Sequence, residues 1–177
     1  MTIKVGDKIV NEPLMIPSKE KGVGSLNLQE FSKGKKIVVF AVPAAFSPTC
    51  SRTHLPGYLE NYDKLIEKGI DAIICVSVND IFVMKAWAKD QNLENVKVIP
   101  DGNGDFTDQM DMLVEKTVIG FGMRSWRYAM IVNNGVIEEM FVEPGIGNNT
   151  SGDPYEVSAP ENVLKYLQSS TLDSNAI

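Results

Sequence analysis

Two nearly continuous apolar runs constrain the fold of this chain more than any other feature. They read KKIVVFAV from Lys35 to Val42 and IDAIICVSV from Ile70 to Val78, and both are rich in β-branched residues. A strand with one solvated face alternates apolar and polar residues, whereas a strand with few polar positions is buried on both faces. Such runs are typical of the central strands of a parallel sheet that helices cover on both sides. The two runs therefore predict an α/β core.

Helical patterns separate and follow the two runs. Between the runs, apolar residues recur at the spacing of a helix that stops near Lys68-Gly69, and these residues are Leu55, Leu59, Tyr62, Leu65 and Ile66. After the second run, Asn79 or Asp80 can cap another helix. The expected inward side chains of that helix are Phe82, Val83, Ala86 and Trp87. The sequence VKVIP then predicts a third strand, which completes a β-α-β-α-β order.

The last part of the chain predicts an antiparallel pair and a final helix. RYAMIVNNGVIEEMFVEPG contains two β-rich stretches joined by Asn134-Gly135, and Asn-Gly favours a tight hairpin. In SAPENVLKYLQS, Ser158 is expected to cap a helix with Val163, Leu164 and Leu167 facing inward. This order is typical of a thioredoxin-like α/β fold, in which helices flank a central mixed β-sheet, here with an N-terminal extension. Residues 1–177 are expected to form one such domain.

Composition and charge exclude several classes of partner. The chain has 17 basic and 23 acidic residues, a formal net charge of −6, and no Lys or Arg between Glu138 and Glu161, so nucleic acid is not an expected partner. No stretch approaches the roughly 18 apolar residues of a membrane span, and no signal-peptide pattern is visible. We therefore expect a cytoplasmic protein without a membrane partner. Two cysteines and one histidine predict free thiols and neither a cofactor nor a metal site.

Cys50 lies in the segment VPAAFSPTCSRTH, just beyond the first apolar run. With Ser47 as the N-cap, Pro48 takes the first helical position and Cys50 falls in the first turn. Free backbone N–H groups and the helix dipole stabilise negative charge there, and the reactivity of a cysteine depends on its thiolate. Cys50 is therefore a candidate reactive thiol, and the alternative is a small buried packing residue.

The neighbours of Cys50 distinguish three reactions of such a thiol. Exchange of the C-x-x-C type lacks its second cysteine, because the sequence reads CSRT. A cysteine hydrolase would need His54 as its base, and a structural or surface histidine is the alternative for this residue. Reduction of a peroxide needs a hydroxyl, backbone N–H groups and a fixed cation. Ser47 and an arginine of GMRSWRYAMIV can supply the hydroxyl and the cation.

These motifs resemble those of the peroxiredoxins. VPAAFSPTCS matches the pattern P-x-x-x-(T/S)-x-x-C, and FSPTCSRTHLPGYLENYDKLIEKGID is similar to the type II, or atypical (peroxiredoxin-5-like), subfamily. The likeness continues through ICVSVNDIFVMKAWAKD, IPDGNGDFTDQM and GFGMRSWRYAMIVNNGVIEEMFVEPG and covers most of Lys35 to Leu167. Within the family, the chain is most similar to the peroxiredoxin part of bacterial peroxiredoxin–glutaredoxin hybrids.

The resemblance implies an antioxidant peroxidase that reduces hydrogen peroxide and small organic hydroperoxides with an external thiol. Cys50 would be the peroxidatic cysteine and would be oxidised to sulfenic acid. Ser47 would bind the peroxide, and Pro43 would shield the site from water. Arg127 would be the catalytic arginine, whereas Arg124 would be a surface or interface residue. The resemblance also implies a homodimer with this site near its interface.

Two residues depart from the family pattern. Ser47 replaces the common Thr and keeps the hydroxyl, although without the methyl group its rotamer is less fixed. Ala44 replaces the common Gly, which raises the question of whether the loop needs a positive φ angle that alanine disfavours.

Cys75 is the second cysteine, and it lies inside the apolar run IDAIICVSV. Its burial pattern favours an inert thiol, with a resolving cysteine as the alternative. We therefore expect a cycle with one catalytic cysteine, in which glutathione and a separate glutaredoxin reduce Cys50; thioredoxin is the other candidate reductant. A different functional hypothesis is a redox sensor or binding module that signals through oxidised Cys50.

Overall fold

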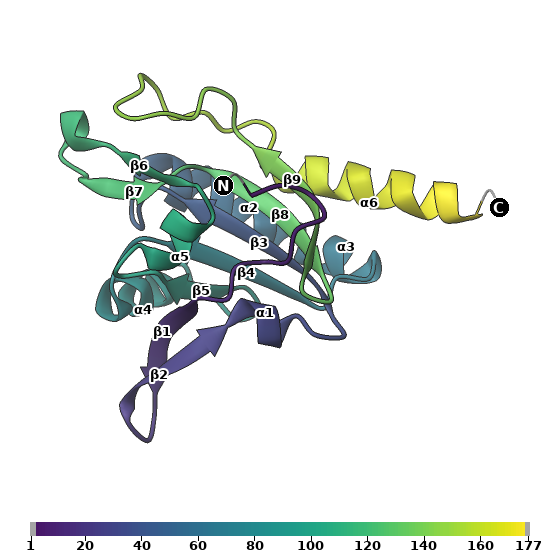
Figure 1. The fold of residues 1–177 in the computed structure, drawn as a ribbon, viewed down its shortest axis with the longest axis horizontal. Coiled ribbons are helices and arrows are strands. Elements are labelled where there is room, and N and C mark those ends of the chain that lie inside the picture. Colours follow the sequence, from purple (N-terminus) through teal and green to yellow (C-terminus); the bar gives the residue numbers. More distant parts are fainter. Residues whose placement is uncertain (1–2, 176–177) are drawn as a thin grey trace.

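A five-stranded mixed sheet forms the centre of the computed structural model (Figure 1), which describes the backbone of residues 3–175 and the side chains of residues 3–170. The strand order is β5-β4-β3-β8-β9. The strands are β3 (Lys36–Val42), β4 (Ala72–Ser77), β5 (Lys97–Pro100), β8 (Tyr128–Asn133) and β9 (Val136–Val142). The first three are parallel to one another, and β8 is antiparallel to both β3 and β9. The predicted α/β core is confirmed.

The central strand β3 separates two hydrophobic cores. Ile37, Val39 and Ala41 belong to one cluster of buried side chains, whereas Val38, Phe40 and Val42 belong to the other. Because successive side chains of a strand point to opposite faces, a strand in this position needs apolar residues throughout. This requirement explains the uninterrupted apolar run that predicted it.

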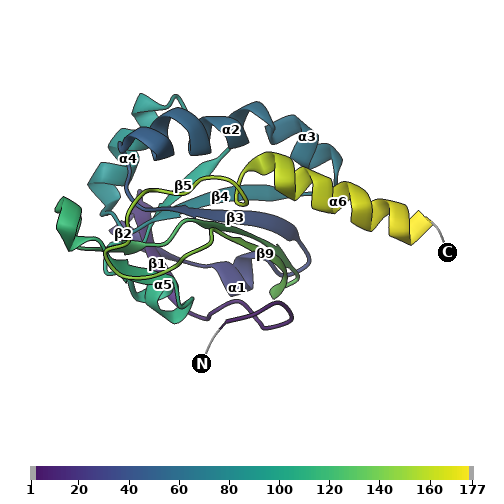
Figure 2. The same cartoon turned by 90° about the horizontal axis from the view of Figure 1, so that it is seen from above.

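Different elements cover the two faces of the sheet (Figure 2). One face packs against α2 (Leu55–Glu60), α3 (Tyr62–Glu67), α4 (Ile81–Asp90) and α6 (Pro160–Asn175). The other packs against α1 (Leu28–Phe31), α5 (Asp105–Gln109) and the hairpin of β1 (Pro13–Ser18) and β2 (Gly22–Asn27). A separate hairpin, β6 (Leu113–Glu115) and β7 (Met123–Ser125), encloses the 3-10 turn η2 (Thr117–Ile119). Among the described residues, no helix is long and apolar enough to span a membrane.

The predicted hairpin between β8 and β9 is confirmed. Asn134 and Gly135 have φ angles of 50° and 81°, which are the two positive values that a type I′ turn requires. The two strands pair from Asn133 and Val136 at the turn to Tyr128 and Val142 at the far end.

The predicted helical faces are confirmed at Leu55, Leu65 and Trp87, which are buried, but not at every position. Ile66 and Phe82 are exposed, and so is Ala86, whereas Tyr58 and Met84 are buried. The first helical segment begins with a π turn, η1 (Cys50–His54), in which the Leu55 N–H donates to the Cys50 carbonyl. A π turn contains an extra residue and so rotates the side chains that follow it. In α4, the cap is Asp80 rather than Asn79. The buried residues of this helix, Met84 and Trp87, are three positions apart and so lie on one face.

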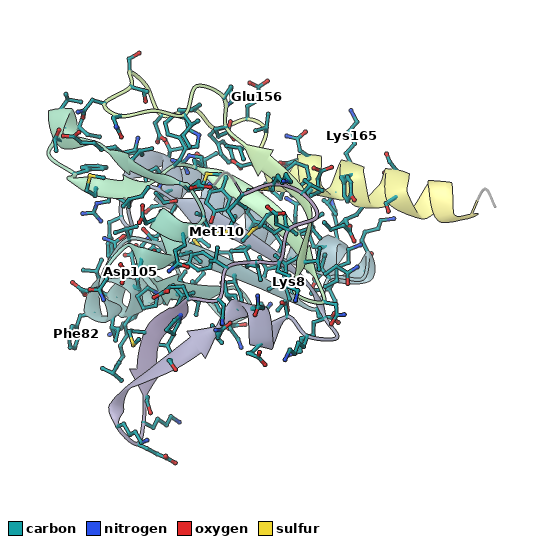
Figure 3. All side chains as sticks on the ribbon, in the orientation of Figure 1. Lys8, Phe82, Asp105, Met110, Glu156 and Lys165 are labelled. Carbon is teal, nitrogen blue, oxygen red and sulfur yellow. The ribbon has the colours of Figure 1, made fainter. Side chains whose placement is uncertain are left out.

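Ser158 does not cap α6 as predicted, because its hydroxyl donates to the buried carboxylate of Glu143 at 2.6 Å. Glu143 is 1% exposed and also accepts backbone N–H bonds from Glu156, Val157 and Ser158, at 2.8 to 3.3 Å. Glu156 is labelled in Figure 3 on the loop that joins β9 to α6. This cluster of hydrogen bonds, which we call the Glu143 clamp, fixes the end of that loop at the sheet.

The clamp predicts a large stability cost for Glu143→Ala. The substitution leaves three backbone N–H groups and one hydroxyl without their acceptor in a buried place, so we expect the free energy of unfolding to fall by about 3 kcal/mol. Glu138→Ala is the control, because Glu138 lies on the preceding strand β9 and its partly exposed carboxylate is paired with Lys36; it should cost at most about 1 kcal/mol. Urea unfolding measures both, and equal losses would contradict the clamp.

Candidate active site

Cys50 is fully buried in the helical turn that follows the loop after β3. Pro43 is buried in the connecting loop, and the helical turn begins at Pro48, where the Ser47 carbonyl accepts the first bond, from Ser51 N–H, at 2.9 Å. The Ser47 hydroxyl donates to the Ala44 carbonyl at 2.7 Å and does not cap the Cys50 N–H. Ser47 thus has the predicted backbone position, but its side chain points to Ala44.

The loop before Cys50 contains one residue with a positive φ angle, and it is Phe46 rather than Ala44. The φ angle of Phe46 is 65°, in the left-handed region that non-glycine residues seldom adopt. Alanine at position 44 therefore carries no strain of the kind that its departure from the family pattern suggested.

Arg127 reaches Cys50 because of the register of the sheet. Ala41, near the end of β3, pairs with Tyr128 at the start of the antiparallel strand β8. Arg127 immediately precedes Tyr128 and therefore lies at the same edge as the helical turn that carries Cys50. Its guanidinium donates from Nη2 to Cys50 Sγ at 3.4 Å, and the residue is only 1% exposed. The structure therefore brings together Cys50 and Arg127, two of the residues that the sequence analysis assigned to this site.

Asp153 also binds Arg127, although no sequence pattern pointed to this residue. Nη2 of Arg127 is 2.8 Å from both carboxylate oxygens of Asp153. Burial opposes the charge of Arg127, but Cys50 and Asp153 outweigh it and raise the pKa of Arg127. The guanidinium is thus a fixed cation between a sulfur and a carboxylate. Asp153 lies on the loop whose end the Glu143 clamp fixes, and no periodic pattern in the sequence indicated that this loop returns to Cys50.

His54 completes the environment of Arg127. It is fully buried, and its Nδ1 is 2.8 Å from Nη1 of Arg127. Since guanidinium is only a donor, Nδ1 is the acceptor and the ring is neutral, with its proton on Nε2. Burial first, and then the charge of Arg127, hold the pKa of His54 well below its usual value, although the backbone of Ser158 acts in the opposite direction. Of the alternatives for His54, the structure agrees with a structural histidine rather than a surface one.

The aromatic neighbours of His54 enclose this site. Phe40 and Tyr155 each lie 4.8 Å from His54 between ring centroids, and Tyr58 stacks on Phe40 at 4.1 Å. The Tyr58 hydroxyl donates to the Ser158 carbonyl at 2.7 Å. The spacing of Cys50 and His54 on one helix face was the sequence signal for a histidine here, but it pointed to Cys50 as its partner rather than Arg127.

Cys75 lies on β4, fully buried and opposite Phe40 in the pairing of β3 with β4. Burial first, and then the neighbouring Cys50, raise the pKa of the Cys75 thiol well above its usual value, with Arg127 acting in the opposite direction. Both cysteines are free thiols. The predicted burial of Cys75 is confirmed, and its environment disfavours the thiolate that thiol chemistry requires.

Arg124 is not at this site. It is half-buried and donates to the carbonyls of Phe121 and Val78. It therefore attaches β7 to the loop after β4 and is not the freely exposed residue that the sequence suggested. Among the described residues, no group of three or more His, Cys, Asp or Glu side chains could hold a metal ion.

The arrangement combines a buried sulfur, a fixed cation beside it and a neutral imidazole that supports the cation. A cation fixed in a low-dielectric place stabilises negative charge on the sulfur and on any oxyanion that forms next to it. A hydrolytic dyad would instead need His54 to accept the proton of Cys50, and its acceptor nitrogen is already bound to Arg127. The geometry favours attack by the sulfur on a group that leaves as an oxyanion.

Comparisons with known proteins agree with this chemistry. The model of the Redoxin family matches residues 4–158. A peroxiredoxin of Rhizobium etli is 52% identical over 78% of this chain and 78% of its own length. The hybrid peroxiredoxin hyPrx5 of Haemophilus influenzae is 53% identical over 78% of this chain and 56% of its own length.

Solved structures lead to the same family. The 1-Cys peroxiredoxin of Plasmodium falciparum superposes with a TM-score of 0.89 at 40% identity, covering 94% of this chain and 99% of that one. Reduced Prx3 of Vibrio vulnificus in complex with hydrogen peroxide gives 0.83 at 42% identity, with the same coverage. The fold is thus thioredoxin-like, as predicted. The chain belongs to the peroxiredoxins of the Redoxin family, and the resemblance to its hybrid, peroxiredoxin-5-like members is confirmed.

The neutral state of His54 predicts a pH dependence of stability. A buried base with a lowered pKa takes up its proton more readily in the unfolded chain, so stability falls as the pH drops below the unfolded value of about 6.5. We expect a loss of about 1 kcal/mol between pH 7 and pH 5.5. Because His54 is the chain's only histidine, His54→Gln, which keeps an acceptor for Arg127, should remove most of this slope. Urea unfolding at several pH values measures it, and an unchanged slope in the variant would contradict a neutral buried His54.

Proposed function

We propose that the protein reduces hydrogen peroxide and small organic hydroperoxides through Cys50 as the peroxidatic cysteine. The observation that carries this proposal is the hydrogen bond of 3.4 Å from the buried guanidinium of Arg127 to Cys50 Sγ. A guanidinium is always protonated, so it stabilises both the attacking thiolate and the departing oxygen.

The oxidative step transfers one oxygen from the peroxide to the sulfur. The Cys50 thiolate attacks the nearer oxygen, so that an S–O bond forms and the O–O bond breaks. The sulfur is oxidised to sulfenic acid, and the peroxide is reduced to an alcohol or to water once the departing oxyanion is protonated. Nε of Arg127 is buried and has no hydrogen-bond partner in the described chain, which leaves it as a donor for an oxygen of the incoming peroxide.

Ser47 and Pro43 support this step in the proposal. The Ser47 hydroxyl uses its hydrogen on the Ala44 carbonyl, so its oxygen retains lone pairs that can accept a bond from the peroxide. Pro43 is buried beside Ala44, where it excludes water and has no N–H that would need a partner.

The reductive step uses an external thiol in the proposal, with no prosthetic group. The thiol attacks the sulfenic sulfur, an S–S bond forms, the S–O bond breaks, and the hydroxyl leaves as water with the proton of the thiol. A second thiol, from glutathione or glutaredoxin, then attacks the sulfur of the first thiol, so that a new S–S bond forms between the two reductants, the bond to Cys50 breaks and Cys50 leaves as the thiolate. Cys50 is fully buried, so the turn that carries it must move to admit a thiol. This turn has the rare π geometry, and we expect it to open more readily than a regular α-helical turn.

Cys75 is a structural thiol rather than a resolving cysteine in this proposal. Its raised pKa and its place opposite Phe40 within the sheet support that role. The similarity to a hybrid peroxiredoxin and to a 1-Cys peroxiredoxin supports a glutaredoxin-dependent cycle with one catalytic cysteine. Thioredoxin is the alternative reductant. We also propose a homodimer located in the cytoplasm.

The test is peroxide consumption by the wild type, Cys50→Ser and Cys75→Ser, each with glutathione plus glutaredoxin and, separately, with thioredoxin. We expect no turnover by Cys50→Ser and at least half of the wild-type rate in Cys75→Ser with glutaredoxin. Full activity of Cys50→Ser would exclude the mechanism. Loss of turnover in Cys75→Ser, with sulfenic acid still formed, would make Cys75 the resolving residue. A wild type that is oxidised once and then stalls with every reductant would indicate a sensor.

A further inference from the structure

A pocket of about 500 Å³ lies beside the Arg127 cluster and has no part in the oxidative step. The β6–β7 hairpin with its turn η2 lines one side, and residues 149–153 of the loop between β9 and α6 line the other. The two sides are attached to each other, since the Val118 N–H donates to the side chain of Asn149 at 3.0 Å. Figure 1 shows this hairpin and this loop next to each other at one end of the sheet.

Lys116 lines this pocket and is only 7% exposed. Its ammonium lies 5.4 Å from the centre of the Trp126 ring, and no carboxylate among the described residues pairs with it. Charges that are almost fully buried are normally paired. The side chain of Lys116 is therefore largely buried, and its charge has no ion pair among the described residues.

Thr150 provides a second unsatisfied polar group on the same pocket. Its Oγ1 is buried and has no hydrogen-bond partner within the part of the chain that the structure describes. Buried polar atoms without partners are uncommon, and each one calls for an explanation such as a ligand. A lysine and a hydroxyl together suit a carboxylate, which accepts hydrogen bonds at both of its oxygens.

The pocket is linked to the reactive sulfur through Asp153 and Arg127. Asp153 lines it, and the carboxylate of Asp153 binds the same nitrogen of Arg127 that contacts Cys50. Because both oxygens of Asp153 lie 2.8 Å from that nitrogen, its negative charge is already paired with Arg127. The exposed side chains of Val118 and Ile119 add apolar surface at the edge of the pocket.

We propose that this pocket, which we call the Lys116 pocket, binds a carboxylate of the small acidic thiol that reduces Cys50 sulfenic acid, as in glutathione. The inference rests on the proposed function, because it concerns the reductant of the same site. Hydrogen peroxide has no carboxylate, so the oxidative step makes no use of Lys116. The thiol would be held next to Cys50 while the buried turn opens, and its sulfur would then form the S–S bond as water leaves.

The test compares reduction of the pre-formed Cys50 sulfenic acid by glutathione and by 2-mercaptoethanol, which lacks a carboxylate. Lys116→Met keeps an unbranched apolar side chain and removes the charge that lies over the Trp126 ring. We expect the glutathione rate at subsaturating thiol to fall by about tenfold, the worth of one charge-assisted hydrogen bond. The 2-mercaptoethanol rate and the rate of oxidation by hydrogen peroxide should remain within about twofold of the wild type.

Lys8→Met is the matched control, because Lys8 is an exposed lysine that lines a different pocket (labelled in Figure 3). It should leave all three rates unchanged. An unchanged glutathione rate in Lys116→Met, or equal slowing by the two thiols, would overturn the Lys116 pocket and leave the proposed function intact. A wild-type sulfenic acid that glutathione does not reduce would instead refute the proposed reductive step, and the pocket proposal with it.

A second experiment tests whether the Lys116 pocket binds the reductant or an acidic peroxide substrate. The distinction is needed because a fatty-acid hydroperoxide also carries a carboxylate. The probe is oxidation of Cys50 by linoleic acid hydroperoxide and by its methyl ester. We expect Lys116→Met to change neither rate by more than about twofold. Selective slowing with the free acid, together with an unchanged glutathione rate, would assign the pocket to the peroxide and overturn its assignment to the thiol.

Discussion

The burial of the Arg127 guanidinium is the constraint on which the rest of the site depends. A charge that is 1% exposed costs several kcal/mol in desolvation unless neighbouring groups compensate for it. Its compensation comes from two separate segments: Cys50 and His54 lie on the π turn, and Asp153 lies on the loop before α6. A fold that keeps this charge buried must therefore hold both segments at the edge of the sheet where Arg127 precedes β8. The same contacts that stabilise Arg127 place a cation against the sulfur.

Each supporting segment is fixed by a feature far from Cys50. The antiparallel register of β8 with β3 sets the position of Arg127. The Glu143 clamp fixes the end of the loop that carries Asp153 and Tyr155. The electrostatics of the cluster depend on His54 being neutral, because a protonated imidazole would place a second positive charge against the guanidinium and could no longer accept its hydrogen bond.

The sequence predicted the parts of this architecture that repeat or that use distinctive residues. Apolar runs identified β3 and β4, and Asn134-Gly135 identified the hairpin. The partners of Arg127 were harder to predict, because Asp153 lies in a loop without periodicity and is joined to Arg127 only through tertiary structure. The predicted helical faces were correct at Leu55, Leu65 and Trp87 and wrong at Ile66, Phe82 and Ala86, which are exposed. Ser158 had the sequence of a cap, but the buried carboxylate of Glu143, just after β9, accepts its hydrogen bond instead.

The most direct test of the account is the second-order rate constant of Cys50 oxidation by hydrogen peroxide in Arg127→Gln, measured by stopped-flow fluorescence. Loss of the buried cation should lower that rate by about 100-fold. Arg124→Gln, which removes an arginine of strand β7 that donates to the carbonyls of Phe121 and Val78 and does not contact Cys50, should stay within about threefold of the wild type. Circular dichroism confirms that both variants are folded. Oxidation of folded Arg127→Gln at the wild-type rate would contradict the central claim that the guanidinium drives the reaction of Cys50.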